Sequence, residues 1–283
     1  MKKNTLFTVL LALAGMMWTT SVQAQKVIVK GDEITEDGSF TPHGGTGTVT
    51  WNKATATLTL DNVNLPNTNS TFLRFEDMPL VKIVLVGNNL VNCRWQALYM
   101  KDCDVEFSGS GSLTVRSKLE TAMQQSLSAP HTLTIKNCKF DVQGKQRSIL
   151  GYSKGQGTER LTLVIDNATV KAKGFTNGGS AMSGIANLKA YQLKNCHIAT
   201  PGVKFGMRPY LTYYELIDDN DQVYPGEVTI VPDNTTGISE VVTSGDATVK
   251  AIYTPDGRQL QKMQRGLNIV KMSDGTTRKV VQQ

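Results

Sequence analysis

The clearest candidates for chemistry are acidic residues, because paired carboxylates can bind a cation or act as general acid and base. Asp102 and Asp104 flank Cys103, which predicts that both carboxylates lie on one side of a strand. Asp61 and Asp166 occupy equivalent corners of a repeat, and stacked corner acids could share a calcium ion. These acids make a polysaccharide lyase or a glycoside hydrolase an alternative function, although solvated turn residues account for them equally well.

Other catalytic and metal-binding patterns are missing from the sequence. The three histidines, His43, His131 and His197, are isolated and have no HxxxH or HExxH spacing. There is no GxSxG nucleophile motif and no P-loop. We therefore expect a protein without a cofactor that is not an enzyme.

Aromatic residues are the next candidates, because exposed rings stack on the faces of sugars. Trp51, Trp95, Tyr99 and Tyr213 are the predicted binding residues. The alternative is that such rings pack at the ends of the fold, with Trp51 in an N-terminal cap and Tyr210–Leu216 in a C-terminal one.

A repeat must position these residues. Short alternating strands flank an Asn or Gly corner, and the corner asparagines recur after 26, 30 and 28 residues, at Asn62 and Asn88 and at Asn137, Asn167 and Asn195. Period-two alternation indicates strands, and Asn and Gly tolerate the left-handed conformation of a sharp corner. We therefore predict an all-β fold, a right-handed parallel β-helix (β-solenoid) of about six coils over residues 25–232. A β-sandwich and a β-propeller remain alternatives.

Two details follow from this register. The run Ser117–Ser126 is the best helix candidate, as an insertion between coils. Cys138 and Cys196 both follow a corner Asn with one coil between them, so they should be free and face inward. Cys93 and Cys103 lie near a coil reversal and are the predicted disulfide pair.

Both ends of the chain carry separate signals. Residues 1–24 combine Lys2 and Lys3, an apolar run and a small residue at Ala24, which predicts a cleavable signal peptide and an exported protein. Residues 233–283 form a small predicted β module with strands near Ala247–Thr254 and Gly266–Met272. The whole chain has 30 basic and 24 acidic residues. This mild excess is spread along the sequence, which argues against nucleic acid and favours an acidic polysaccharide.

Two segments resemble known secreted proteins. The runs Ile252–Arg258, Arg265–Lys271 and Arg278–Val281 look like the C-terminal sorting domain that the type IX secretion system of Bacteroidetes reads. That family usually has an aromatic residue where Asn268 stands and ends in Lys, where this chain has Gln283. The resemblance implies a cell-surface or secreted protein that meets outer-membrane secretion machinery, or a periplasmic one if the module is vestigial.

The body resembles the β-helical carbohydrate-binding-domain proteins. The similar stretches are Gly45–Leu65, Phe107–Val115 and Leu193–Pro201. The clostridial relatives of that group bind pectic polysaccharide on a parallel β-helix. The resemblance implies a monomeric, non-enzymatic polysaccharide-binding protein; the alternative is a surface scaffold or adhesin with a protein partner.

Overall fold

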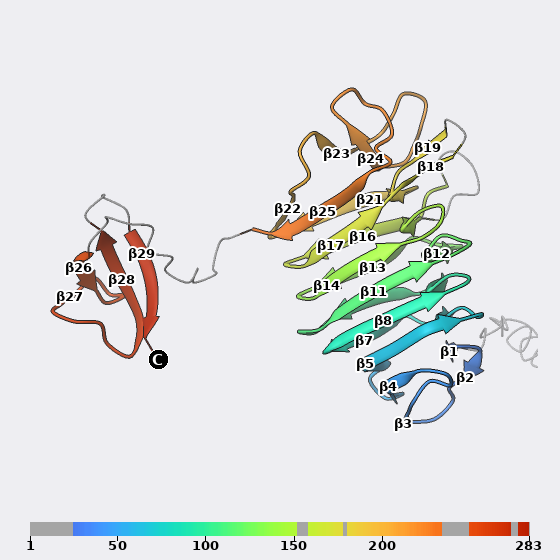
Figure 1. Ribbon diagram of the computed structural model, residues 1–283, viewed down its shortest axis with the longest axis horizontal. Helices are drawn as coiled ribbons and strands as arrows, with labels where there is room; N and C mark the ends of the chain where they lie inside the picture. Colours follow the sequence, from blue (N-terminus) through green and yellow to red (C-terminus); the bar gives the residue numbers. More distant parts are fainter. Residues whose placement is uncertain (1–24, 152–157, 178–179, 234–248, 273–276, 283) are drawn as a thin grey trace, which may run out of the picture. The chain divides into compact units, whose positions relative to one another are not determined.

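The computed structural model describes residues 25–151, 158–177, 180–233, 249–272 and 277–282. Within these ranges the chain forms only strands, turns and loops (Figure 1). It divides into two units with the boundary between Asp233 and Asn234, one residue from the predicted one. The predicted signal peptide, residues 1–24, lies outside the described residues.

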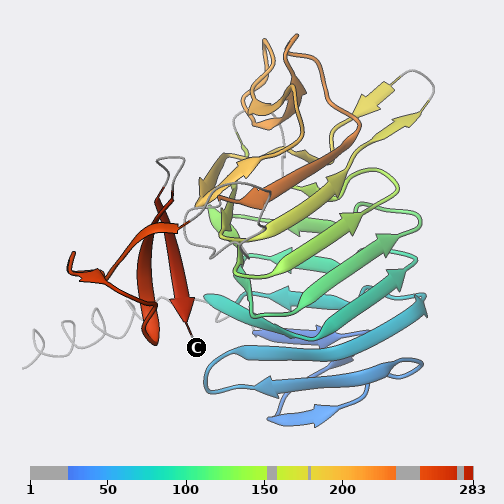
Figure 2. The same ribbon diagram turned by 60° about the vertical axis from the view of Figure 1, so that its left-hand side comes forward.

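The first unit is the predicted β-solenoid, with about five turns. Each full turn contributes one strand to each of three stacked faces, which Figures 1 and 2 show from two sides. The first face contains β7 (Leu80–Val86), β10 (Asp104–Ser108), β13 (His131–Lys136), β16 (Leu161–Asp166) and β21 (Ala190–Lys194). The second face contains β8 (Asn88–Cys93), β11 (Ser112–Ser117), β14 (Lys139–Gln143) and β17 (Thr169–Lys173). The third face contains β6 (Leu73–Glu76), β9 (Leu98–Lys101), β12 (Met123–Ser126), β15 (Ile149–Leu150) and β20 (Ile185–Ala186).

Strand pairing explains how the faces join. The first two faces belong to one 14-stranded sheet, because the long β5 (Thr57–Thr68) pairs with both β7 and β8. The third face belongs to a separate seven-stranded sheet. Alternate residues point inward along these strands, so that Val105 and Phe107 of β10 stack on Leu133 and Ile135 of β13 in a continuous apolar core.

The corners between the first and second faces use the predicted residues. Four corner asparagines adopt left-handed backbone conformations, with φ of 50° at Asn62, 51° at Asn137, 47° at Asn167 and 52° at Asn195. The next rung after Asn62 has Gly87 at this place, with φ of 62°, so the predicted counterpart Asn88 is displaced by one residue. The side chains also link rungs, because Asn167 Nδ2 donates to Asn137 Oδ1 at 2.8 Å.

The cysteines correct one prediction and confirm another. Cys138 and Cys196 are free and buried, as expected from their places on alternate coils. The predicted Cys93–Cys103 disulfide is wrong, since both are free thiols. The whole strand β9 separates them: Cys93 ends β8 before it, and Cys103 lies in the corner after it.

The helix predicted at Ser117–Ser126 is also wrong. Ser117 ends β11, and Met123–Ser126 forms β12, which pairs in parallel with β9 and β15. Its alternating burial matches the neighbouring rungs. Backbone pairing and burial within the stack therefore override the local helix propensity of this segment.

Antiparallel strands cover both ends of the solenoid. At the N-terminal end, β4 (Thr46–Asn52) runs antiparallel to β5 and buries Trp51 at 3 % exposure, as the capping alternative predicted. At the C-terminal end, β25 (Glu227–Pro232) runs antiparallel between β17 and β22 (Cys196–Ile198). The hairpin of β23 (Val203–Gly206) and β24 (Glu215–Asp218) adds a second cover, where Tyr191 stacks on Phe205 at 4.4 Å between ring centroids. The remaining short strands are β1 (Lys26–Val29), β2 (Asp32–Glu33), β3 (Gly38–Phe40), β18 (Phe175–Asn177) and β19 (Ser180–Met182).

The second unit is a four-stranded antiparallel sheet, which confirms the predicted small β module. Its strands are β26 (Val249–Tyr253), β27 (Gln259–Leu260), β28 (Gly266–Met272) and β29 (Thr277–Gln282), in the order β27-β26-β28-β29. The Asn268 side chain is buried. Its Oδ1 accepts a hydrogen bond from the main-chain N–H of Gln264, and its Nδ2 donates one to the main-chain carbonyl of Gln264. The residue that departs from the sorting-domain pattern therefore fixes the turn that enters β28.

Candidate functional sites

The four predicted sugar-binding aromatics do not form one site. Trp51 is buried under the N-terminal cap, so its ring cannot stack on a sugar and that assignment is corrected. Tyr213 lies in the C-terminal cover, where burial raises the pKa of its phenol. Trp95 and Tyr99 belong to one turn of the solenoid, at the start of the third face.

Tyr99 stands in the middle of a row on the outside of the third face. The strand register places Arg74 beside it on the preceding rung and Gln124 on the following one. The Arg74 guanidinium carbon lies 5.0 Å from the Tyr99 ring centroid. Gln96 Nε2 donates to Gln124 Oε1 at 3.2 Å, so the amide of Gln124, the neighbour of Tyr99 on the next rung, is held in place. An aromatic ring beside a fixed amide and a guanidinium is the usual composition of a sugar-binding surface.

Charged neighbours hold this row in place. Arg74 is paired with Glu76 on its own strand. Lys101, two residues after Tyr99, lies 3.3 Å from Asp77 and 3.9 Å from Glu76. The Glu76 and Asp77 side chains are only 11 % exposed, so the pairs restrict Arg74 and Lys101 more than a loose surface contact would.

Trp95 lies at the adjacent corner, between β8 and β9. Its side chain is 39 % exposed, and the Arg94 guanidinium carbon lies 5.5 Å from its ring centroid. Its main-chain carbonyl accepts a hydrogen bond from Ser117 Oγ at 2.6 Å and from Cys93 Sγ at 3.0 Å. The corner backbone is therefore fixed, and the exposed indole is presented on a rigid support.

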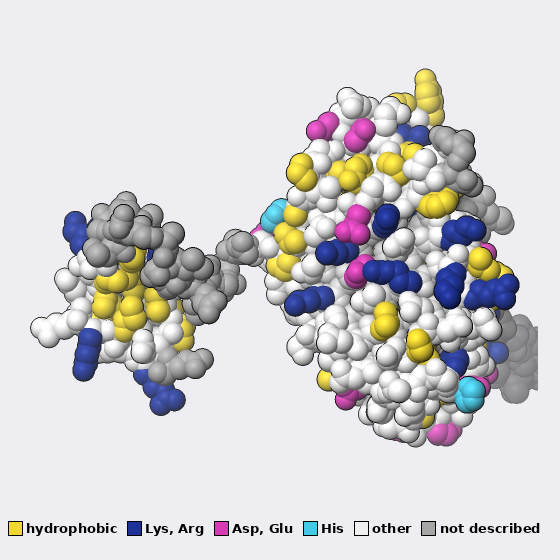
Figure 3. Space-filling view, in the orientation of Figure 1, with side chains coloured by type: hydrophobic (Ala, Val, Ile, Leu, Met, Phe, Trp, Pro, Cys, Tyr) yellow, Lys and Arg dark blue, Asp and Glu magenta, His cyan; other side chains and the backbone are white. Residues whose placement is uncertain are grey.

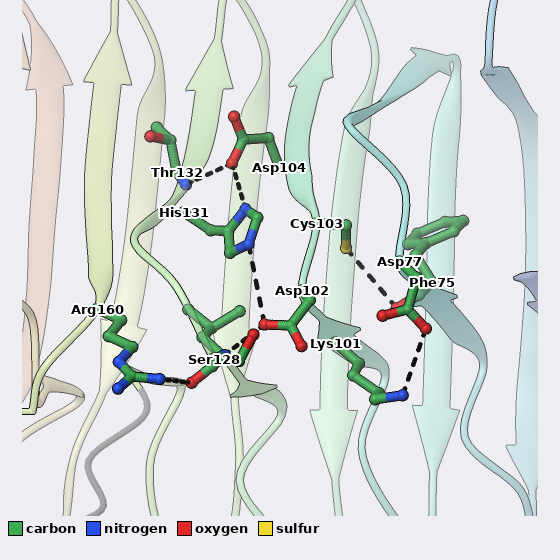
Figure 4. Close-up of polar contacts among 11 residues, drawn as sticks. Phe75, Asp77, Lys101, Asp102, Cys103, Asp104, Ser128, His131, Thr132 and Arg160 are labelled. Atoms are coloured by element: carbon green, nitrogen blue, oxygen red, sulfur yellow. Dashed lines mark hydrogen bonds and ion pairs between the residues drawn. The ribbon is translucent and has the colours of Figure 1, made fainter. Parts of the chain in front are cut away.

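The predicted acidic pair Asp102 and Asp104 meets a histidine. Figure 4 shows His131 between them, with Nδ1 at 2.9 Å from Asp104 Oδ1 and Nε2 at 3.9 Å from Asp102 Oδ1. Both carboxylates also accept backbone N–H groups of the next rung: Asp104 from Thr132 at 2.9 Å, and Asp102 from Ser128. These bonds close the corner between the third and first faces. The cluster therefore has a structural explanation that requires no reaction.

A shared cation at the corner acids is ruled out by the register. Asp61 lies on β5 and Asp166 on β16, and the sheet places β7, β10 and β13 between these strands. Four strand spacings of about 4.8 Å separate the two carboxylates by about 19 Å. Among the described residues, no group of three or more His, Cys, Asp or Glu side chains could hold a metal ion.

Positive charge gathers on one face, contrary to the even distribution along the sequence. Figure 3 shows Lys and Arg side chains clustered over the side of the solenoid that carries β8, β11, β14 and β17 in Figure 1. Sequence reasoning missed this cluster, because its members are about 25 residues apart and meet only once the strand register is known. The same holds for His131, which is isolated in sequence but paired across a rung.

Comparisons with protein-family models, with curated proteins and with solved structures found no match for this chain. In the part of the chain that the structure describes, no helix is long and apolar enough to cross a membrane.

Proposed function

We propose that this protein is an exported, non-enzymatic β-solenoid that binds polysaccharide on its third face. The observation that carries the proposal is the row Arg74, Tyr99 and Gln124, with Gln96 bonded to Gln124 at one side. The ring supplies apolar contact with a sugar face, and the amides and guanidinium supply hydrogen bonds to hydroxyl groups. Trp95 adds an exposed ring at the neighbouring corner, beside the half-buried Tyr99.

The test is a glycan array followed by titration calorimetry on the best ligand. Tyr99→Ala removes the ring and should weaken binding at least tenfold, which corresponds to about 1.4 kcal/mol. Tyr210→Ala is the matched control, because Tyr210 is 93 % exposed and belongs to the C-terminal cover. If both variants bound the glycan as tightly as the native protein, the third face would be excluded as the binding site. No glycan binding alongside capture of a protein partner would favour the scaffold or adhesin alternative.

An enzymatic function is the second candidate, and the Asp102–His131–Asp104 cluster is the observation that favours it. Its test is incubation with pectic polysaccharides while unsaturated ends and reducing sugars are measured. We expect no product. Product that is made by the native protein and disappears in Asp102→Ala or Asp104→Ala would replace the non-enzymatic proposal.

The C-terminal module serves sorting or surface attachment in this proposal. Its support is the resemblance of the runs Ile252–Arg258 and Arg265–Lys271 and the separate antiparallel sheet that they form. In a host with type IX secretion, cell fractionation should find the full chain at the surface or in the medium, and a chain ending at Asp233 in the periplasm. The same location for both would exclude a sorting role.

A further inference from the structure

Seven cations form what we call the basic face, on the second face and the corner that follows it. The exposed lysines Lys139, Lys171 and Lys173 lie on β14 and β17, and Arg116 lies on β11. Exposed Arg94, Lys118 and Lys145 follow the ends of β8, β11 and β14, at successive turns of one corner. Figure 3 shows this concentration of Lys and Arg from outside.

The acids near the basic face are few. Asp141 is bound by Arg116, with 2.8 Å between Nη2 and Oδ2, and the same guanidinium donates to the Asp141 carbonyl at 3.0 Å. Glu227 of β25 lies opposite Lys173, and Glu120 lies in the corner loop. Within the described residues, Lys139, Lys171 and Lys173 form no ion pair. Three exposed ammonium groups therefore remain available to an anion from outside.

The first face shows what a balanced surface of this solenoid looks like. There Lys82 is paired in register with Glu106. Asp166 lies between Lys136 and Lys194 on neighbouring rungs. On that face Glu106 and Asp166 offset three lysines, which leaves an excess of one cation. The basic face also has in-register acids, Asp141 beside Lys171 and Glu227 beside Lys173, but its seven cations exceed its three acids by four. The imbalance on the basic face is therefore a local property and does not follow from the composition of the chain.

The uncharged residues of the basic face favour a sugar polymer. Across the strands, Ser112 and Thr169 flank Lys139 in one row. In the next row, Asp141 lies between Thr114 and Lys171. The row of Arg116 and Lys173 contains Gln143 between them. Rows are about 6.8 Å apart along a strand and rungs about 4.8 Å apart across strands, so hydroxyls, amides and cations, with the single carboxylate of Asp141, alternate over the surface of these strands. An aromatic ring that could stack on nucleic-acid bases is missing from the outward positions of these four strands.

We propose that the basic face is a second binding site, which takes a linear anionic polysaccharide whose acid groups contact Lys139, Lys171 and Lys173. The polymer crosses the strands of the second face, and Ser, Thr and Gln side chains bond its hydroxyl groups. The three lysines are distinct from the row around Tyr99, which lies in the other sheet of the solenoid, although Arg94 of the basic face borders Trp95. Either site can therefore fail without the other.

The experiment measures binding of the full chain to polygalacturonate, dextran sulfate and duplex DNA. The test variant is Lys139→Gln/Lys171→Gln/Lys173→Gln, and the matched control is Lys82→Gln/Lys136→Gln/Lys194→Gln. Both remove three charges from strands of the same sheet. We expect the test variant to raise the Kd for the bound polysaccharide about tenfold and the control to change it less than twofold. Raising the salt from 0.1 to 1 M should weaken native binding, because the screening length falls from about 10 to about 3 Å.

The three ligands distinguish the chemistry. Binding of polygalacturonate alone assigns carboxylates as the recognised group, and binding of dextran sulfate alone assigns sulfates. Equal losses in both variants would show that net charge alone drives binding and would overturn the proposal. Binding of neither polysaccharide, or tighter binding of duplex DNA than of both, would also overturn it. Circular dichroism of both variants checks that the solenoid is folded.

Discussion

At the residue scale, the buried cysteines make a prediction about alkaline pH. Burial raises the pKa of the Cys103 and Cys138 thiols from 9.0 to about 12. The folded state therefore holds these protons up to a higher pH than the unfolded state does, and this part of the stability is complete below about pH 9. It is lost as the pH rises from about 9 to about 12.

Urea unfolding between pH 8 and 11 measures this effect. The free energy of unfolding should fall more steeply in the native protein than in Cys103→Ala/Cys138→Ala. The two proteins share all their other titratable groups, so the difference in slope belongs to the thiols. The overall stability of the variant is lower because of the lost core volume, and only the slopes are compared. Parallel slopes would contradict the burial of these thiols.

At the scale of the element, the corner asparagines should contribute to stability through their conformation. Asn167 has φ of 47° and its side-chain amide bonds Asn137 on the neighbouring rung. Asn167→Ala puts an ordinary side chain in the left-handed region and removes the bond, which should cost about 1–3 kcal/mol. Asn167→Gly removes the bond but accepts the conformation, so its loss should be smaller.

Asn92→Ala is the matched control for these corner variants. Asn92 points outward near the end of β8 and has no positive φ, so the substitution should change the free energy of unfolding by less than about 0.5 kcal/mol. Urea denaturation of all the variants gives the comparison. Equal stability of the alanine and glycine variants at position 167 would show that the conformation of the corner contributes nothing.

Among the elements, the sequence could predict those whose signals are local. Alternation and corner residues are local, so they predicted the solenoid, the corners and the inward cysteines correctly. The helix at Ser117–Ser126 was wrong because pairing with β9 and β15 comes from distant residues. The Asp104–His131 contact and the rows of the basic face depend on register between rungs, and a shift of one residue, as between Asn88 and Gly87, moves a side chain to the other surface.

At the scale of the whole molecule, we expect the solenoid to fold and to bind its ligands without the C-terminal module. Every residue assigned to the third-face row or to the basic face lies before Asp233, and the unit boundary follows that residue. A chain that ends at Asp233 should therefore keep the melting temperature of the solenoid and its binding to polysaccharide. Calorimetry and the binding titration measure both on the same sample.

A second truncation, ending at Gly226, tests what closes the solenoid. It removes only β25 in addition, but β25 pairs with β17 on one side and β22 on the other. Its loss leaves the edge of β17 open next to buried Val170 and Ala172. Open edges of long sheets pair with other chains, so this protein should aggregate or melt at least about 5 °C lower, while the chain ending at Asp233 stays monomeric in size-exclusion chromatography. If both truncations behaved alike, β25 would not be the closing strand, and the stability of the last turns would have to come from the β23–β24 hairpin alone.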